Sequence, residues 1–213
     1  MLERGVHRVS TDEKTGIQAL ERAHPDQPAS PGKLERREFE YHRHGTQTLI
    51  ANFEVATGQV ISPTVGDTRT EADFVAHIRT TVAVDPGAEW IFIVDQLNTH
   101  KSAGLVRLVA ELCGVPDDLG RKGESGILRD MVSRKAFLEN ETHRVRFVYT
   151  PKHCSWLNQV EIWFSILSRR LLKHASFTST EELKHRILAF IKVFNETWAK
   201  PFRWTYIGKP LMS

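Results

Sequence analysis

Three acidic residues occupy positions where a charge needs a partner. Glu161 borders an apolar stripe with helical spacing, made of Leu157, Val160, Phe164, Leu167 and Leu171. At about 40° from that stripe on a helical wheel, Glu161 is expected to lie at the edge of the core. Asp95 ends the strand-like run 90–94, and Asp12 follows a short N-terminal segment. Because burying a lone carboxylate is costly unless it is paired or binds a metal, the three acids predict a carboxylate cluster for a divalent cation.

Each acid also has an ordinary structural explanation when it is taken alone. Glu161 suits an exposed position on a helix, because charged residues are mostly solvated. Asp95 suits a cap or turn at the end of a strand, and Asp12 suits a turn at the surface. Only the combined pattern favours a metal site.

The bulk composition sets loose limits on the class of protein. The chain has 213 residues, of which 40% are hydrophobic, and this is ample for one domain with a sizeable core. A net charge of +3 permits a nucleic-acid partner without proving one. Cys113 and Cys154 form no CxxC pair, so we expect two reduced thiols rather than a zinc knuckle or a disulfide framework. Without a signal peptide or an apolar run of about 18 residues, we expect a soluble, cytoplasmic protein with no membrane partner.

The hydrophobic pattern predicts the elements that must position these acids. Alternating or continuous apolar runs predict strands at about 5–11, 39–41, 49–55, 59–63, 90–94 and 144–150. Helical periodicity predicts helices at about 70–83, 101–113, 155–173 and 179–198. Ser155 is expected to cap the helix that carries Glu161, and the proline-rich stretch 21–33 is expected to form a loop.

This order of elements predicts an α/β protein with a ribonuclease H-like mixed sheet of order 3-2-1-4-5, flanked by helices. The first and fourth strands are neighbours in that sheet. Asp12 and Asp95 would then stand side by side, with the helix of Glu161 packed beside them. The stretch 116–143 fits no element of the core, so we expect an insertion with a short helix at about 127–138.

Five segments, in the same order along nearly the whole chain, carry a family resemblance. They are Asp12–Arg22, His44–Thr46, Asp95–Lys101, Thr150–Glu161 and Pro201–Trp204. Each segment alone is weak evidence, but the full set resembles the catalytic part of IS630-type transposases, within the IS630/Tc1/mariner group of DDE endonucleases. By this resemblance Asp12, Asp95 and Glu161 are the three catalytic, metal-binding acids.

The resemblance implies a DNA transposase that cleaves and transfers strands at transposon ends. Both reactions are in-line displacements at phosphorus, which two Mg²⁺ or Mn²⁺ ions about 3.5–4 Å apart can assist. Such hard cations favour carboxylate oxygens. We expect Asp95 to bridge the two ions, and Asp12 and Glu161 to hold mainly one each. The nucleophile would be water for cleavage and a DNA 3′-hydroxyl for joining, so no protein nucleophile is needed.

Several other residues are candidates for supporting roles. Gln96 stands where many family members have Asn, and we expect it to keep an amide near the metal site. His100 could touch the scissile phosphate, make a structural hydrogen bond or serve at the start of a helix. Asn158 could orient Glu161 or be a satisfied amide in the first helical turn. Candidate DNA contacts are Lys14, Lys101, Lys152, Arg169, Arg170 and Lys173. The last three would equally suit a solvated helix end.

The resemblance also sets expectations for organisation and partners. Relatives carry helix-turn-helix domains ahead of the first acid, whereas Met1 precedes Asp12 by only 11 positions. We therefore expect a single catalytic domain spanning 1–213, without that DNA-binding domain. The expected partners are double-stranded DNA, both as transposon end and as target, and a second copy of the chain in an active homodimer. The expected location is the nucleoid of a prokaryotic cell.

Two alternatives to the transposase function remain. One is an inactive remnant that binds DNA or protein, and the other is a ribonuclease H-like nuclease with another substrate.

Overall fold

A single mixed sheet forms the centre of the molecule. The computed structural model describes residues 5–24, 28–34, 40–116, 118–151, 154 and 157–203. Its strands are β1 (Val6–Arg22), β2 (Tyr41–Glu54), β3 (Val60–Gly66), β4 (Glu89–Val94) and β5 (Val145–Tyr149). Their order is β3-β2-β1-β4-β5, in which β1, β2 and β3 pair antiparallel while β1, β4 and β5 pair parallel. The predicted fold class and strand order are confirmed.

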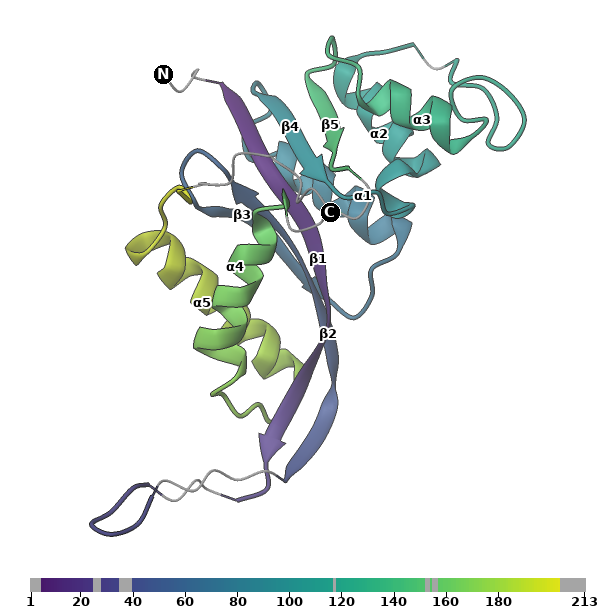
Figure 1. Ribbon diagram of the computed structural model, residues 1–213. Coiled ribbons are helices and arrows are strands. Elements are labelled where there is room, and N and C mark those ends of the chain that lie inside the picture. Colours follow the sequence, from purple (N-terminus) through teal and green to yellow (C-terminus); the bar gives the residue numbers. More distant parts are fainter. Residues whose placement is uncertain are drawn as a thin grey trace, which may run out of the picture.

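Helices cover both faces of the sheet (Figure 1). On one face lie α4 (Val160–Leu167), continued by a π-helical turn (Ser168–Leu172), and α5 (Thr180–Thr197). On the other lie α1 (Glu71–Val82), a 3₁₀ turn (Thr99–Lys101), α2 (Ala103–Cys113) and α3 (Met131–Leu138). Within the described part of the chain, no helix is long and apolar enough to cross a membrane.

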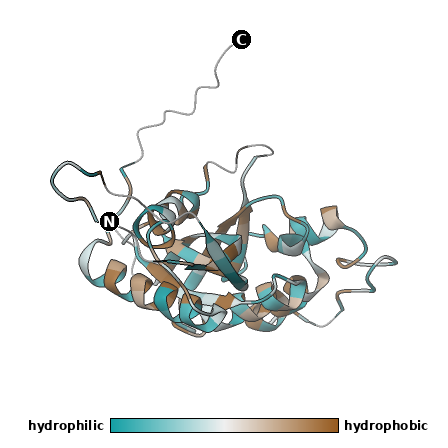
Figure 2. Cartoon of the chain, turned by 90° about the horizontal axis from the view of Figure 1, so that it is seen from below, coloured by the Kyte–Doolittle hydropathy of each residue, from teal (hydrophilic) through white to brown (hydrophobic). Residues whose placement is uncertain are grey.

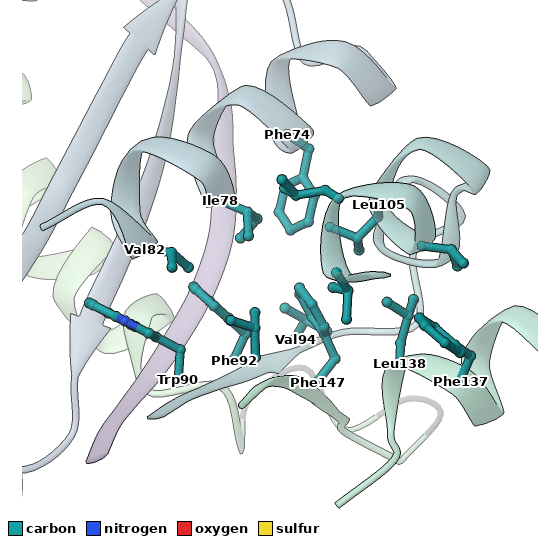
Figure 3. Close-up of a cluster of buried hydrophobic side chains, with 14 of the residues drawn as sticks. Phe74, Ile78, Val82, Trp90, Phe92, Val94, Leu105, Phe137, Leu138 and Phe147 are labelled. Atoms are coloured by element: carbon teal, nitrogen blue, oxygen red, sulfur yellow. The ribbon is translucent and has the colours of Figure 1, made fainter. Parts of the chain in front are cut away.

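Two hydrophobic cores hold these layers together, one on each face of the sheet. Figure 3 shows the core under α1, α2 and α3, where side chains from the helices meet those of β4 and β5. The second core lies between the sheet and α4 and α5, and Phe53, Trp163 and Phe177 are fully buried in it. Figure 2 shows the same division, with hydrophobic residues concentrated on the strands and on the inner sides of the helices. Burying each large apolar side chain stabilises the fold by about 1.5–3 kcal/mol.

The first strand is much longer than predicted. It runs from Val6 to Arg22 rather than over 5–11, and its second half forms a two-stranded ribbon with β2 that extends past α4 and α5 (Figure 1). Irregular pairing between Lys14 and Ile17 breaks the alternation of side chains, which hid this strand in the sequence. Asp12 therefore lies within a paired strand, opposite Ala51 of β2, and not beyond the end of a short one.

The helix that carries Glu161 begins later than predicted. It starts at Val160, with Gln159 at the N-cap position, instead of near 155. The proposed cap, Ser155, lies outside the described residues. Trp163 joins Val160 on the buried face, which turns the centre of that face about 110° away from Glu161. Glu161 is consequently exposed, and the prediction that it borders the core is wrong.

The segment between α2 and β5 packs onto the domain. Its helix, α3, begins at Met131 rather than 127, behind a capping box formed by Asp130 and Ser133. Leu128 and Leu138 of this segment are buried in the core with α1 and α2. Its status as an insertion into the fold stays a prediction.

Candidate active site

The register of β1 and β4 brings the first two acids together. The parallel ladder pairs Ser10 with Ile93. Extending that register by two residues sets Asp12 opposite Asp95, which directly follows β4. Neighbouring strands lie about 4.8 Å apart, so the two residues are near each other in the sheet, and the charge of Asp95, in addition to burial, raises the pKa of Asp12.

A buried amide ties the start of α4 to the first acid. Asn158 donates from its side-chain nitrogen to Asp12 Oδ2 at 3.2 Å and to the Thr11 carbonyl at 3.0 Å. The Ser10 hydroxyl donates to Asn158 Oδ1 and accepts from the Val160 backbone N–H at 2.9 Å. Of the two roles considered for Asn158, orienting Glu161 or being a satisfied amide, the structure shows the second, with the amide bonded to Asp12 and to the Thr11 carbonyl. The helix bearing Glu161 therefore begins beside Asp12.

The Asp12 carboxyl is in an unfavourable place for a negative charge. Burial raises its pKa to about 7, although the Glu13 backbone N–H, which donates to Oδ1 at 2.8 Å, acts in the opposite direction. The charges of Asp95, Glu13 and Glu161 raise the pKa of Asp12 further. A carboxyl group under these influences favours a bound proton or a nearby cation.

The side chain of His100 links two acids. Its Nε2 lies 3.2 Å from Glu13 Oε1, and its Nδ1 lies 2.8 Å from Asp95 Oδ1, off the line of the N–H bond. The ring is fully buried against Phe74, and the Tyr149 hydroxyl donates to the His100 carbonyl at 2.6 Å. Of the roles expected for His100, the structure displays the hydrogen-bonded one.

These contacts keep His100 protonated and Asp95 ionised. Burial alone would lower the pKa of His100, but the nearby carboxylates of Asp95 and Glu13 outweigh it and raise the pKa to about 9. The close contact with His100 in turn lowers the pKa of Asp95, against the effect of burial, and the Leu97 backbone N–H adds to the lowering. Asp95 is thus a carboxylate at neutral pH.

Gln96 and Lys101 brace the chain that follows β4. The Gln96 amide donates to the Thr150 carbonyl at 2.7 Å, and its oxygen accepts from Lys101 Nζ at 3.3 Å. Lys101 is buried, with its ammonium 5.7 Å from the ring of Tyr149. Both amide atoms of Gln96 are therefore used to join the end of β5 to the 3₁₀ turn. Lys101 faces inward, where its charge helps to keep Asp95 ionised.

The chemistry of the donor set fits a hard divalent cation. Asp12, Asp95 and Glu161 offer only carboxylate oxygens, the ligands that Mg²⁺ and Mn²⁺ prefer. The desolvated Asp12, whose pKa is raised by three further acids, supplies the electrostatic reason for a cation there. Nevertheless, no three His, Cys, Asp or Glu side chains in the described ranges are gathered closely enough to form a ready set of ligands. The exposed Glu161 is the member with most freedom to turn toward the other two.

Basic residues line the far end of α4. Arg169, Arg170 and Lys173 are exposed on and after the π turn, and Lys14 lies nearby, 6.0 Å from the ring of Phe164. Lys152, also expected to bind DNA, lies outside the described residues. A cavity of about 640 Å³ opens here, lined by Ile166, Arg169, Arg170, Phe194, Thr197, Trp198, Ala199, Lys200 and Phe202. The guanidinium of Arg170 lies 4.7 Å from the ring of Trp198, which is 44% exposed.

The mixed sheet with helices on both faces is the ribonuclease H-like fold. It is shared with a Mos1 mariner paired-end complex with Mn (TM-score 0.54, 13% identity, covering 88% of this chain and 48% of that one). It is shared also with a pre-cleavage Mos1 transpososome (TM-score 0.53, 13% identity, covering 90% and 53%). The chain thus spans about half the length of these proteins.

The family follows from the sequence model that the chain matches. The model described as DDE superfamily endonuclease aligns with residues 7–184, so the chain belongs to this family. The match is consistent with the resemblance to the IS630/Tc1/mariner group. No curated protein matches the sequence.

One participant in the site was missed by sequence reasoning. Glu13 was noted only as part of a motif, yet its side chain is 2% exposed and contacts His100. The available signal was a pair of adjacent acids, Asp12 and Glu13, in a strand with both faces covered. Alternate side chains of such a strand point to opposite faces, so both acids become buried.

Proposed function

We propose that this chain is the catalytic domain of a DNA transposase that cleaves and transfers DNA strands with the help of two Mg²⁺ or Mn²⁺ ions. The proposal depends mainly on the location of Asp12, which lies close to Asp95 and is hydrogen-bonded to Asn158. The β1–β4 register, extended two residues beyond its last pair, supports a location of Asp12 next to Asp95, and Asn158 joins the start of the Glu161 helix to Asp12 by a hydrogen bond. Membership of the DDE endonuclease family supports the same assignment.

Within this proposal each acid has its own task. Asp12 and Asp95 hold the cations from the rigid sheet, while Glu161 completes the set from the exposed first turn of α4. When bound, the ions stabilise negative charge on the attacking and leaving oxygens of the phosphodiester. His100 keeps Asp95 ionised and fixes its carboxylate, and Asn158 fixes that of Asp12.

The DNA is proposed to follow the exposed side of α4. That side runs from Glu161 to Arg169, a distance of about 12 Å at 1.5 Å per residue. Arg169, Arg170 and Lys173 at its far end would contact phosphates on one side of the scissile bond. The Mos1 structures are paired-end complexes and a transpososome. By analogy we propose that two copies of this chain act together on transposon ends and target DNA.

The test compares strand cleavage by the chain and by variants of the three acids. A duplex with a labelled strand, and one with a free 3′-hydroxyl for joining to a plasmid, report the two reactions with Mg²⁺, with Mn²⁺ and with chelator. Asp12→Asn, Asp95→Asn and Glu161→Gln should each lower both reactions by at least about 100-fold. Chelation should abolish both.

A matched control is available on the neighbouring helix. Glu181, like Glu161, is an exposed acid in the first turn of a helix that begins on the same face of the sheet. Glu181→Gln should leave cleavage unchanged. If Glu161→Gln cleaves as well as Glu181→Gln, the proposed mechanism is wrong. In that case the second candidate function, a DNA-binding or protein-binding module without catalysis, would be favoured. Its support is that no three potential metal ligands lie close together among the described residues.

A further inference from the structure

Glu13 is a buried acid to which the proposed chemistry gives no task. Its neighbour in the strand, Asp12, faces α4 and contacts Asn158. Glu13 points to the other face of the sheet, where His100 packs against Phe74 of α1. Its carboxylate contacts His100 there, and it is not one of the three acids proposed above as metal ligands, although it is next to Asp12 in the sequence.

The contacts of Glu13 lead instead to Asp95. Its carboxylate lies 3.2 Å from Nε2 of His100, whose Nδ1 lies 2.8 Å from Asp95 Oδ1. The imidazole is a rigid spacer with both nitrogens occupied by acids, and burial leaves it no room to turn. The location of the Glu13 carboxylate thus limits where the Asp95 carboxylate can lie.

The orientation of Asp95 has a direct consequence for a cation. Both His100 and the Leu97 backbone N–H, at 2.9 Å, contact the same oxygen, Oδ1. With Oδ1 held in this way, Oδ2 is the oxygen presented to an ion. A residue that hydrogen-bonds to a metal ligand fixes the direction of that ligand, and its loss typically weakens metal binding about 10–100-fold.

We propose that Glu13 is a positioning residue for the metal site: through His100 it fixes the carboxylate of Asp95 so that Oδ2 faces the cation. The inference rests on the proposed function, because it takes Asp95 as a metal ligand. It assigns the second acid of the Asp12–Glu13 pair to the support of the site and not to the ligand set.

The experiment measures Mn²⁺ affinity by calorimetry on the whole chain, together with the free energy of unfolding and the kcat and KM for DNA cleavage. Glu13→Ala should weaken Mn²⁺ binding about 10–100-fold, the usual effect of losing such a support. It should lower kcat while the KM for DNA stays unchanged. Glu13→Gln keeps an oxygen that accepts from Nε2, so it should recover most of the Mn²⁺ affinity.

Two further variants separate positioning from mere packing. Glu54 and His7 form a comparable pair on the same sheet, with 2.6 Å between Oε1 and Nδ1. His7 lies five residues before Asp12, about 16 Å along the strand. Glu54→Ala should lower stability without changing Mn²⁺ affinity. If Glu13→Ala is folded and also leaves Mn²⁺ affinity unchanged, the positioning role is overturned.

A double-mutant cycle with Glu13→Asp covers the case in which Glu13→Ala folds poorly. Glu13→Asp keeps the charge but withdraws the carboxylate from Nε2, so it should weaken Mn²⁺ binding in the parent chain. If Glu13 acts through His100, Glu13→Asp should change Mn²⁺ affinity no further once His100→Gln is present. Additive effects of the two substitutions would overturn the proposal. The Asp95→Asn variant separates the positioning role of Glu13 from the proposed function. If Asp95→Asn binds Mn²⁺ as tightly as the parent chain, both the proposed function and the positioning role are overturned. If Asp95→Asn loses Mn²⁺ affinity but Glu13→Ala does not, only the positioning role is overturned.

Discussion

Asn158 donates a hydrogen bond at 3.2 Å to Asp12, although the two residues are 146 positions apart in the sequence. The bond joins the residue that precedes α4 to the middle of β1. It fixes the distance between two elements that are separated along the chain by β2, β3 and all the elements from α1 to β5. The contact therefore ties the stability of the domain to the geometry of the proposed site.

Replacing Asn158 by Leu should damage both properties. The side chain is fully buried and contacts Ser10, Thr11 and Asp12, so its loss leaves buried polar groups without a partner. Such a loss costs about 1–3 kcal/mol, and we expect that decrease in the free energy of unfolding. Urea denaturation measures it, and cleavage assayed far below the midpoint should also fall. Full activity with lowered stability would show that Asn158 supports the fold only.

Asp12→Asn should separate stability from metal binding. The neutral amide removes a buried charge that lies near Asp95 and Glu161. It also leaves only one oxygen for the two N–H donors of Glu13 and Asn158. Because the two effects oppose each other, the metal-free variant should be about as stable as the parent chain. Mg²⁺ at 100 times its Kd should stabilise the parent by about 2.7 kcal/mol, as for any ligand of the native state alone. The variant should gain much less. Thermal unfolding with and without Mg²⁺ gives both values, and equal gains would remove Asp12 from the ligand set.

The order of the strands was predictable because the succession of strands and helices along the chain matched the ribonuclease H-like arrangement, and apolar runs such as 90–94 marked the buried strands. The length of β1 was not, because the irregular pairing near Gly16 interrupts its alternation and the outer half is charged. The exposure of Glu161 was mispredicted for a different reason. Whether Trp163 faces the core or the solvent decides which way the helix is turned, and periodicity alone does not settle that for an amphipathic ring.

The hydrogen-bond and ion-pair partners of the site residues could not be predicted from the sequence either. His100 was recognised as a candidate, but its two acids come from separate strands, and their distances depend on the register of β1 against β4. Asn158 was placed near Glu161 because both lie in one segment. Only the packing of α4 on β1 shows that its side chain turns to Asp12.

A second buried histidine should make stability depend on pH. His77 of α1 accepts from the Asn52 amide through Nε2 at 2.8 Å, so Nδ1 carries the proton and donates to the Thr64 hydroxyl at 2.8 Å. Burial lowers its pKa to about 3 from an ordinary value of 6.5. Between pH 6.5 and pH 3, His77 is protonated in the unfolded chain but stays neutral in the folded chain. The free energy of unfolding therefore falls as the pH drops from about 6.5 toward 3.

The His77 contribution amounts to about 1.4 kcal/mol per pH unit within that window. The variant His77→Gln keeps a donor and an acceptor but cannot titrate. Its free energy of unfolding should therefore decline less steeply between pH 6.5 and pH 4 than that of the parent. Denaturant unfolding measures the free energy of unfolding of both chains across this pH range. In the difference between the two chains, the contributions of the acids that both contain cancel. Parallel curves would mean that His77 is not neutral in the folded state.

Arg169 and Arg170 should govern the salt dependence of DNA binding. Both are exposed at the π turn, and Arg170 is already oriented by its contact with Trp198. If each neutralises one phosphate of duplex DNA, replacing both by Ala should reduce the slope of log K against log salt by about 1.8. The loss should be similar for DNA of any sequence, since phosphate contacts carry no sequence information. Fluorescence anisotropy titrations at several salt concentrations measure this slope.

The control removes the same charge from the opposite face of the sheet, through Arg79→Ala on α1 and Arg107→Ala on α2, where both side chains are exposed. An equal change of slope in the control would mean that the DNA responds to net charge and does not follow α4.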